Sequence, residues 1–245
     1  TAMGNGLMLH GGMRAYVATF FVFSDYTKPM ARLSALMRVP LTFVFTHDSI
    51  GVGEDGPTHE PVEQLAMFRS IPNFHVFRPC DAVETAAAWC SAVESEKTPT
   101  ALVLSRQNLP AVEGTSREAE KGAYVLGDCE GTPELILMAS GSEVALAVKA
   151  KTELEKEGRK VRVVSMPSME VFEEQTAEYK ESVLPGTVRK RVAIEALCVF
   201  GWHRYVGLDG TLITMDGFGA SAPSGKLFEH FGFTVDHVVA AAKAL

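Results

Sequence analysis

Short apolar runs rich in β-branched and aromatic residues alternate along this chain with segments of helical pattern, and this alternation limits the possible folds most strongly. A strand followed by a helix and another strand predicts parallel pairing through right-handed crossovers. We therefore predict an α/β fold of two three-layer αβα units with mostly parallel sheets. The predicted strands are residues 15–20, 41–46, 74–77 and 100–104 in the first unit, and 135–139, 161–164, 191–195 and 212–215 in the second.

Residues 107–122 separate the two units. They contain Pro110 and Gly114, and a charged run from Arg117 to Lys121 with little apolar content. Polar segments with proline and glycine are typical of domain boundaries. We predict one domain over residues 1–115 and a second over residues 123–245.

The second domain carries few residues that suggest chemistry. Ser140 and Glu143 have the S-x-x-E spacing of a capping box, which predicts the start of a helix at this point. Glu195, His203 and Arg204 lie among polar and aromatic residues, and we interpret them as structural because a fold by itself assigns no function.

The overall composition argues against several classes of protein. The net charge of −7 disfavours nucleic acid as the main partner. No apolar run approaches the roughly 18 residues of a membrane span, and no signal peptide is visible. The cysteines form no C-x-x-C pair, so we expect free thiols and a cytoplasmic location. The four cysteines are Cys80, Cys90, Cys129 and Cys198.

A dense polar loop follows the predicted strand 41–46. Residues 47–61 read HDSIGVGEDGPTHEP, with two histidines, four carboxylates, three glycines and two prolines. Open α/β sheets bind ligands at the carboxyl ends of their strands, on loops that the rigid strands hold in place. We predict that this polar loop (residues 47–61) binds a ligand or carries catalysis.

Three kinds of chemistry fit the polar loop. Its G-x-G-x-x-G spacing matches a dinucleotide fingerprint, but Glu54 and Asp55 would put negative charge where a pyrophosphate must bind, so we reject that match. His47, Asp48, Glu54, Asp55 and His59 are all possible metal ligands, although no local metal-binding pair such as H-x-H is present. The same groups could instead bind a hydroxylated substrate, with Arg106 either holding a phosphate or forming a surface ion pair.

Four aromatic residues occur within the seven positions from Phe20 to Tyr26. Phe20, Phe23 and Tyr26 recur at steps of three, so on a helical turn they would share one face. Core packing is the commoner role for such a stripe. The alternative is a slot for a flat heteroaromatic ring, in which the Tyr26 hydroxyl would bind a partner.

Several blocks of this sequence resemble bacterial-type members of the transketolase family. The polar loop is the longest of them, with residues 47–50 and 53–61 similar to the family's signature loop. The resemblance covers essentially the whole chain. The other blocks are FFVFSDY from Phe20, SRQNL from Ser105, SGSE from Ser140, VSMPS from Val164 and GFGASAP from Gly217.

The resemblance implies a reaction and roles for particular residues. Members of the family transfer a two-carbon ketol unit from a ketose phosphate to an aldose phosphate in the pentose phosphate pathway, with thiamine diphosphate and Mg²⁺ or Ca²⁺. Phe20, Phe23 and Tyr26 would then wall the cofactor's aminopyrimidine ring instead of packing in the core. His59 would be catalytic and would contact the cofactor and the hydroxyl of the transferred unit. Asp55 would bind a hydroxyl of the donor sugar. His47 and Arg106 would bind the substrate phosphate.

The resemblance also implies that this chain is part of a longer protein. Family members begin with a domain that binds the diphosphate and the metal, and a glutamate that activates the cofactor should lie just before Thr1. We therefore expect a truncated product, incomplete at the N-terminal edge of its first unit, that alone binds no thiamine diphosphate and shows no ketol transfer. Because the family's sites lie between two chains, we expect a homodimer. A metal-dependent hydrolase using His47, Asp55 and His59, and a non-catalytic interaction subunit, stay open as alternatives.

Overall fold

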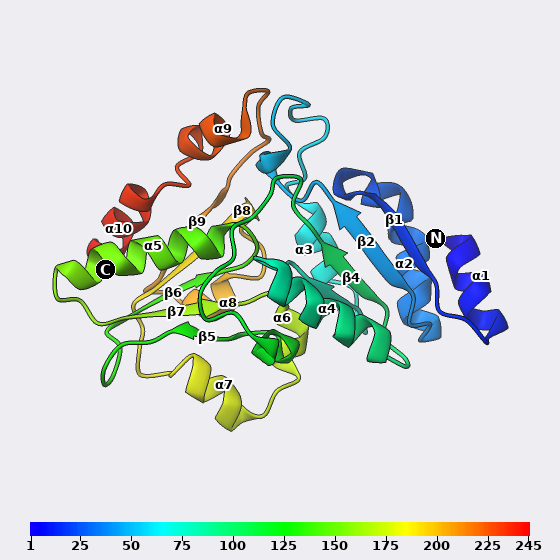
Figure 1. The fold of residues 1–245 in the computed structure, drawn as a ribbon, viewed down its shortest axis with the longest axis horizontal. Coiled ribbons are helices and arrows are strands. Elements are labelled where there is room, and N and C mark those ends of the chain that lie inside the picture. Colours follow the sequence, from blue (N-terminus) through cyan, green and yellow to red (C-terminus); the bar gives the residue numbers. More distant parts are fainter.

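The computed structural model describes all 245 residues, which form two α/β domains side by side along the long axis of the molecule (Figure 1). The strands of the first domain are β1 (Tyr16–Phe20), β2 (Thr42–Thr46), β3 (His75–Phe77) and β4 (Thr100–Val103). They form one parallel sheet in the order β1-β2-β4-β3. Apolar runs of β-branched and aromatic residues suit such a sheet, because helices cover both of its faces.

Two hydrophobic clusters show how helices enclose the first sheet. The helical elements are α1 (Ala2–His10), η1 (Phe21–Phe23), α2 (Ser24–Met37), η2 (Ile50–Val52), α3 (Gln64–Arg69) and α4 (Ala82–Glu94). Buried side chains of α2 and α3 pack with Phe43 and Val103, whereas α4 packs with Phe77 and Leu102. Because successive strand residues point to opposite faces, the two clusters lie on opposite sides of the sheet.

The second domain repeats this plan with a larger sheet. Its strands are β5 (Tyr124–Gly127), β6 (Leu135–Ala139), β7 (Val161–Ser165), β8 (Arg191–Cys198) and β9 (Thr211–Met215). Their order is β5-β7-β6-β8-β9, and only β5 runs antiparallel. The predicted α/β architecture of mostly parallel sheets with helices is therefore confirmed.

Helices also cover both faces of the second sheet. The short helix η3 (Arg117–Lys121) lies in the segment between the domains, and the helical elements of the second domain are α5 (Glu143–Lys156), α6 (Met169–Glu173), α7 (Ala177–Val183), α8 (His203–Val206), α9 (Ser224–His230) and α10 (Val235–Lys243). Helices α5 and α10 pack with Leu137 and Ile194 on one face. Helices α6, α7 and α8 pack with Ile136 and Ala193 on the other.

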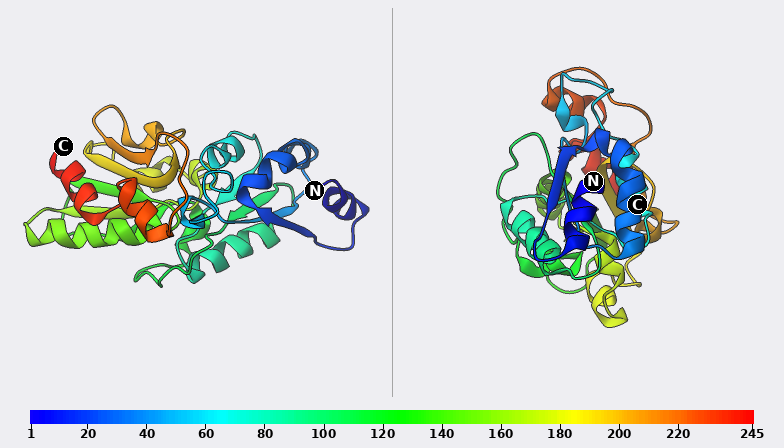
Figure 2. Two further views of the ribbon diagram at one scale, coloured as in Figure 1. Left: turned by 90° about the horizontal axis from the view of Figure 1, so that it is seen from above. Right: turned by 90° about the vertical axis from the view of Figure 1, so that its right-hand side faces the viewer.

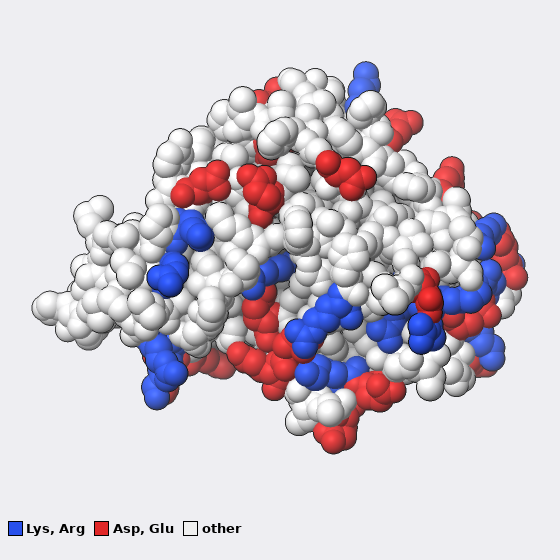
Figure 3. Space-filling view, turned by 180° about the vertical axis from the view of Figure 1, so that it is seen from behind, with Lys and Arg blue, Asp and Glu red and all other residues white.

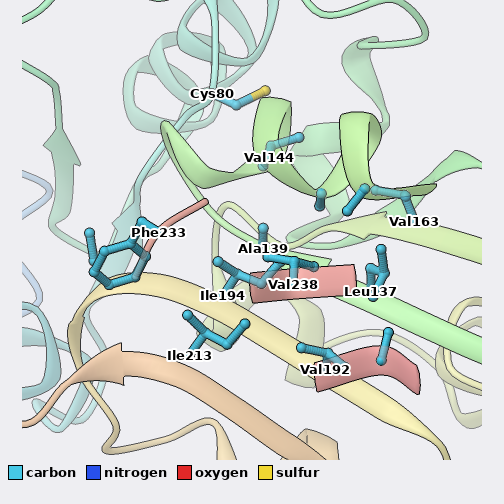
Figure 4. Close-up of a cluster of buried hydrophobic side chains, with 14 of the residues drawn as sticks. Cys80, Leu137, Ala139, Val144, Val163, Val192, Ile194, Ile213, Phe233 and Val238 are labelled. Atoms are coloured by element: carbon cyan, nitrogen blue, oxygen red, sulfur yellow. The ribbon is translucent and has the colours of Figure 1, made fainter. Parts of the chain in front are cut away.

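The two domains share their hydrophobic cores. The largest cluster joins the second sheet and α5 to Ile50, Val62 and Cys80 of the first domain, and Figure 4 shows Cys80 beside Val144 of α5. In the opposite direction, Leu197 of β8 belongs to the cluster under α2 and α3. Since Ile50 is part of the polar loop, that loop rests partly on the core of the second domain.

Some local features differ from the sequence-based expectations. Helix α2 begins at Ser24 and contains Pro29 as its sixth residue, which is tolerated at the cost of one backbone hydrogen bond. The short elements β5 and α6 to α9 were not predicted, because their patterns are too brief to stand out. The capping box is wrong: Ser142 is the N-cap of α5 and makes no side-chain cap bond, and the side chains of Ser140 and Glu143 bind elsewhere.

The surface combines intermingled charges with one largely uncharged end. Figure 3 shows Lys, Arg, Asp and Glu side chains interspersed over the second domain, whereas the left-hand end, where α1 lies, is mostly white. Exposed apolar side chains at this end include Met3, Leu7 and Leu9 of α1 and Tyr16 of β1. No helix is both long enough and apolar enough to cross a lipid bilayer.

Candidate ligand-binding site

The polar loop leaves the carboxyl end of β2 at the junction of the two domains. In Figures 1 and 2 it lies beside the segment that leads into α9. Ser221 of that segment donates a hydrogen bond from Oγ to the Glu54 carbonyl oxygen at 2.5 Å. Gly56, with a φ of 74°, lies so close that an added Cβ would be 3.1 Å from the Ser221 Cβ. The loop is thus held from outside by the second domain.

Aromatic and imidazole rings gather where the polar loop meets the end of β1. Phe20 pairs in register with Thr46, which brings the Phe20 ring onto His47, with centroids 3.7 Å apart and planes 23° apart. Phe23 meets His59 edge-on at 5.5 Å. The Phe20 and Phe23 rings are nearly parallel, 6.2 Å apart. The structure therefore brings together Phe20, Phe23 and both predicted histidines.

The aromatic stripe is not part of the core. Phe20 and Phe23 are 38% and 37% exposed, and Tyr26, whose ring lies 6.4 Å from Phe23, is 83% exposed. The core-packing interpretation of the stripe is wrong. Exposed aromatic rings beside polar side chains are typical of a surface that binds another molecule.

His47 is held in an uncommon backbone conformation. Its φ of 64° is left-handed, which few residues other than glycine adopt, and its Nδ1 lies 3.0 Å from Thr46 Oγ1. Burial and the Arg106 guanidinium lower the pKa of His47 below its usual 6.5, and Asp55 opposes them. The imidazole is therefore neutral at pH 7 and can act as donor or acceptor.

The other predicted polar residues surround His47. Arg106 and Asp55 lie close enough for their charges to act on the His47 imidazole. His59 Nδ1 is 2.9 Å from Thr58 Oγ1, and Asp55 and Arg106 are exposed. Arg106 forms no ion pair with a carboxylate, which excludes the surface ion pair that we considered for it. These side chains are free to bind a ligand.

A buried ion cluster lies beneath the loop. Asp48, directly after His47, accepts a hydrogen bond from Arg78 Nε through Oδ2 at 2.9 Å, and the same oxygen forms an ion pair with Arg78 Nη2 at 2.8 Å. Arg78 Nη1 donates to Glu143 Oε2 at 2.5 Å. Burial opposes the charge of Arg78, but Glu143 and Asp48 outweigh burial and raise its pKa. We call Asp48, Arg78 and Glu143 the Arg78 cluster.

The second domain extends this cluster with further buried polar contacts. Ser140 accepts from Arg78 Nη1 through its carbonyl oxygen at 2.8 Å, and its hydroxyl donates to Glu195 at 2.5 Å. Glu195 is fully buried and also binds Arg69, through two bonds of 2.8 and 2.9 Å, and the Trp202 indole at 2.7 Å. Burial disfavours the Glu195 carboxylate, but Arg69 outweighs it and lowers the pKa. The structural interpretation of Glu195 fits these contacts.

Glu60 is a buried carboxylate near the end of the polar loop. Neither of its oxygens has a hydrogen-bond partner, and it is 2% exposed. Burial raises the pKa of Glu60 to about 7. The nearby backbone amides of Ala220 and Gly53 oppose this rise, although neither forms a hydrogen bond with the carboxylate. Gly219 leaves room for this carboxylate, since an added Cβ would overlap Glu60 Oε2.

Sequence reasoning missed Arg78, Glu143 and Glu60 as parts of the site's support. Arg78 directly follows the predicted strand 74–77, and that position was the one available signal. Glu143 was assigned to a capping box, and Glu60 was counted only as one more carboxylate of the loop.

The polar side chains of the loop do not form a metal site. Across the whole chain, no group of three or more His, Cys, Asp or Glu side chains is arranged to hold a metal ion. His47, Asp55 and His59, which the hydrolase alternative requires, therefore lack the geometry of a shared metal centre.

Fold and site together define a class of protein. This is a two-domain α/β protein with a candidate ligand site of aromatic, imidazole and guanidinium groups at the carboxyl ends of a parallel sheet. The family model described as the transketolase pyrimidine-binding domain matches residues 1–112. The model described as the transketolase-like C-terminal domain matches residues 122–234.

Curated relatives match along the entire chain. Transketolase from Halalkalibacterium halodurans is 59% identical over 251 residues, covering 100% of this chain and 38% of that protein. Transketolase from Bacillus subtilis is 58% identical over 252 residues, with the same coverage. The chain belongs to the transketolase family, and it spans little more than a third of the length of these relatives.

Solved structures share the fold. Transketolase from Leishmania mexicana superimposes with a TM-score of 0.95 at 46% identity, covering 100% of this chain and 36% of that one. A Pichia stipitis transketolase, described as a complex with sedoheptulose 7-phosphate, gives 0.93 at 46% identity, covering 99% and 36%. A protein described as a split-gene transketolase, in an inactive β4 tetramer, gives 0.81 at 27% identity, covering 99% and 79%.

Proposed function

We propose that the intact protein containing this chain transfers a two-carbon ketol unit between sugar phosphates, with thiamine diphosphate as cofactor. The observation that carries this proposal is the pairing of Phe20 with His47 and of Phe23 with His59 at the ends of parallel strands. Small-ligand sites typically combine an apolar slot with a few convergent polar groups. The match to a pyrimidine-binding domain of the transketolase family supports this reading.

The aromatic residues suit a flat heteroaromatic ring. Phe20 and Phe23 present nearly parallel, partly exposed faces, and we propose that they and Tyr26 wall the aminopyrimidine. Bound thiamine diphosphate supplies the electron sink that lets a carbon–carbon bond beside a carbonyl break. The diphosphate and its Mg²⁺ or Ca²⁺ are proposed to bind a domain of the longer protein outside this chain.

The polar residues suit a phosphorylated sugar. Arg106 is exposed and free of carboxylate partners, so its guanidinium can bind a phosphate through two parallel hydrogen bonds. His47, neutral at pH 7, can donate to the same phosphate. Asp55 is assigned to a donor hydroxyl, and His59 to the cofactor and the hydroxyl of the transferred unit. The sugar phosphate named for the Pichia stipitis structure supports this substrate class.

We propose that the 245-residue chain alone is inactive and binds no thiamine diphosphate. It spans 38% of the curated transketolase from Halalkalibacterium halodurans, and no group of its side chains is arranged to hold the metal. The split-gene relative, of which this chain covers 79%, is described as inactive in its own tetramer.

The uncharged end of the molecule suits a protein partner. Met3, Leu7, Leu9 and Tyr16 are exposed there, and apolar surface of this kind marks protein contacts. We propose that a diphosphate-binding domain and a second subunit of a homodimer cover this end in the intact protein. The free cysteines agree with a cytoplasmic location.

The test is an assay of the intact protein and of the isolated chain side by side. Each is mixed with thiamine diphosphate, Mg²⁺, xylulose 5-phosphate and ribose 5-phosphate, and sedoheptulose 7-phosphate is measured. We expect product from the intact protein and none from the chain. Absence of product from the folded intact protein would refute the proposed activity, and turnover by the chain would refute its inactivity.

A further inference from the structure

Arg78 belongs to the first domain by sequence but is anchored in the second. Its backbone N–H donates to the Pro167 carbonyl oxygen at 2.8 Å, and its own carbonyl accepts from the Gly141 N–H at 2.9 Å. Gly141 has a φ of 57°, and an added Cβ there would lie 2.6 Å from the Arg78 Cζ. The second domain therefore provides a fitted recess for this guanidinium.

The guanidinium joins two carboxylates from different domains. Asp48 belongs to the polar loop and Glu143 begins α5, and all three side chains of the Arg78 cluster are at most 2% exposed. Glu143 Oε2 also accepts from the Ala196 N–H at 2.9 Å. Buried charges of this kind are tolerated only with close, well-directed partners, so the cluster permits few alternative arrangements.

The cluster acts next to the residues of the candidate site. Asp48 directly follows His47, whose left-handed backbone depends on the position of its neighbours. Further contacts hold the loop on the second domain, among them Ile50, which lies in its core, and the hydrogen bond from Ser221 to Glu54. Among these anchors, the Arg78 cluster alone adjoins His47 in the chain.

We propose that Arg78 is a positioning residue, which ties Asp48 to Glu143 so that the second domain sets the placement of the polar loop and its histidines. This assigns the second domain a defined task in a site to which it contributes no residue of its own. The inference rests on the proposed function for its catalytic consequence, but its structural part can be tested without catalysis.

The test requires a conservative substitution in the Arg78 cluster at the partner that belongs to the second domain. Arg78→Ala would leave two buried carboxylates unpaired and could unfold the chain. Glu143→Gln instead keeps the size of the side chain and does not touch the loop. The matched control is Glu84→Gln, because Glu84 is also fully buried at the domain junction, where it binds Tyr124 and Ser165.

Amide hydrogen exchange in the 245-residue chain gives the readout. Val52, Gly53 and Gly56 donate backbone hydrogen bonds within the loop. In Glu143→Gln we expect their exchange to accelerate about tenfold or more, the factor for losing one charged hydrogen bond. In Glu84→Gln we expect less than about twofold. Core amides of β6 report any general loss of stability in both variants.

Equal acceleration of the loop amides in both variants, or none in Glu143→Gln, would overturn the proposal. A second route uses Asp48→Asn, which breaks the same cluster from the loop side. We expect the double variant with Glu143→Gln to exchange no faster than the faster single variant. Independent, multiplying effects would contradict the coupling.

The intact protein supplies the functional readout. With Glu143→Gln we expect kcat for ketol transfer to fall about tenfold while KM for the sugar phosphate changes less than about twofold, because a misplaced loop harms reaction geometry more than binding. Unchanged kcat with accelerated loop exchange would overturn the catalytic consequence. If the unaltered intact protein showed no transfer, the proposed function would fail, yet the exchange experiment would still decide the structural coupling.

Discussion

The carboxyl ends of the two sheets both carry polar side chains, but they use them in opposite ways. At the first sheet, His47 is partly exposed, and Arg106 is exposed without an ion pair. At the second sheet, Ser140, Ser165 and Glu195 are fully buried and bound to neighbouring side chains. The first set can meet a ligand, whereas the second set is already satisfied within the protein.

A polar strand end is therefore not a binding site by itself. A site needs groups with free hydrogen-bonding capacity that face solvent, and buried polar groups almost always have partners inside the protein. The end of the second sheet serves as a base for the polar loop of the first. Substitutions at the two sheet ends test whether the two sets of residues have separate roles.

The largest expected effect is on stability, from the buried arginine that joins the two sheets. Arg78→Ala should lower the free energy of unfolding by about 3–5 kcal/mol, because Asp48 and Glu143 stay buried without a partner. Denaturant titration of the 245-residue chain measures this. The control Arg189→Ala, at an exposed pair with Asp209, should cost at most about 1 kcal/mol. Equal losses of unfolding free energy in both variants would show that the Arg78 cluster stabilises the fold no more than an exposed ion pair does.

A smaller effect is expected at the open end of the first sheet. In the intact protein, Arg106→Ala should raise KM for phosphorylated sugars about tenfold, since one charged, two-bonded contact to phosphate is lost. Steady-state kinetics with a phosphorylated and a non-phosphorylated ketose compare the two cases. KM for the non-phosphorylated sugar should stay within about twofold. The same rise in KM for both sugars would show that Arg106 does not bind the phosphate.

A third prediction concerns the dependence of stability on pH at Glu60. Its pKa is raised from 4.5 to about 7 in the folded protein, so between these values the folded state binds more protons than the unfolded state. Stability from this group is therefore full below pH 4.5 and is lost as pH rises to about 7. Glu60→Gln should remove this part of the slope in denaturant titrations at several pH values. An unchanged slope would show that Glu60 ionises normally.

Much of the fold was predictable because its signals are local. The runs that became β2, β4 and β6 are apolar over most of their length, as expected of strands covered on both faces. The exposed part of the site was also predictable from the sequence, since His47 and Asp55 lie in a polar loop directly after such a strand. The family resemblance then separated the roles of these residues, which spacing alone left open.

The support beneath the site was not predictable, because its contacts are long-range. Arg78 meets Asp48 across 30 positions and Glu143 across 65, and nothing near Arg78 in the sequence indicates either partner. The spacing of Ser140 and Glu143 predicted a local helix cap. In the structure, Glu143 instead binds Arg78 of the first domain, and the Ser140 hydroxyl binds Glu195. Nothing in the sequence distinguishes Glu60 from the solvated carboxylates of the loop. Only the structure shows that Gly219 packs against it and encloses it.

The most direct test of the separate roles combines turnover and stability for one residue at each sheet end. In the intact protein, His59→Ala should lower ketol transfer at least about a hundredfold, as expected for a catalytic group, without changing the unfolding midpoint. Ser165→Ala should lower the free energy of unfolding by about 1 kcal/mol through the lost bond to Glu84, with turnover within about twofold. Normal turnover in His59→Ala, or a collapse of turnover in a fully folded Ser165→Ala, would contradict the separate roles of the two sheet ends.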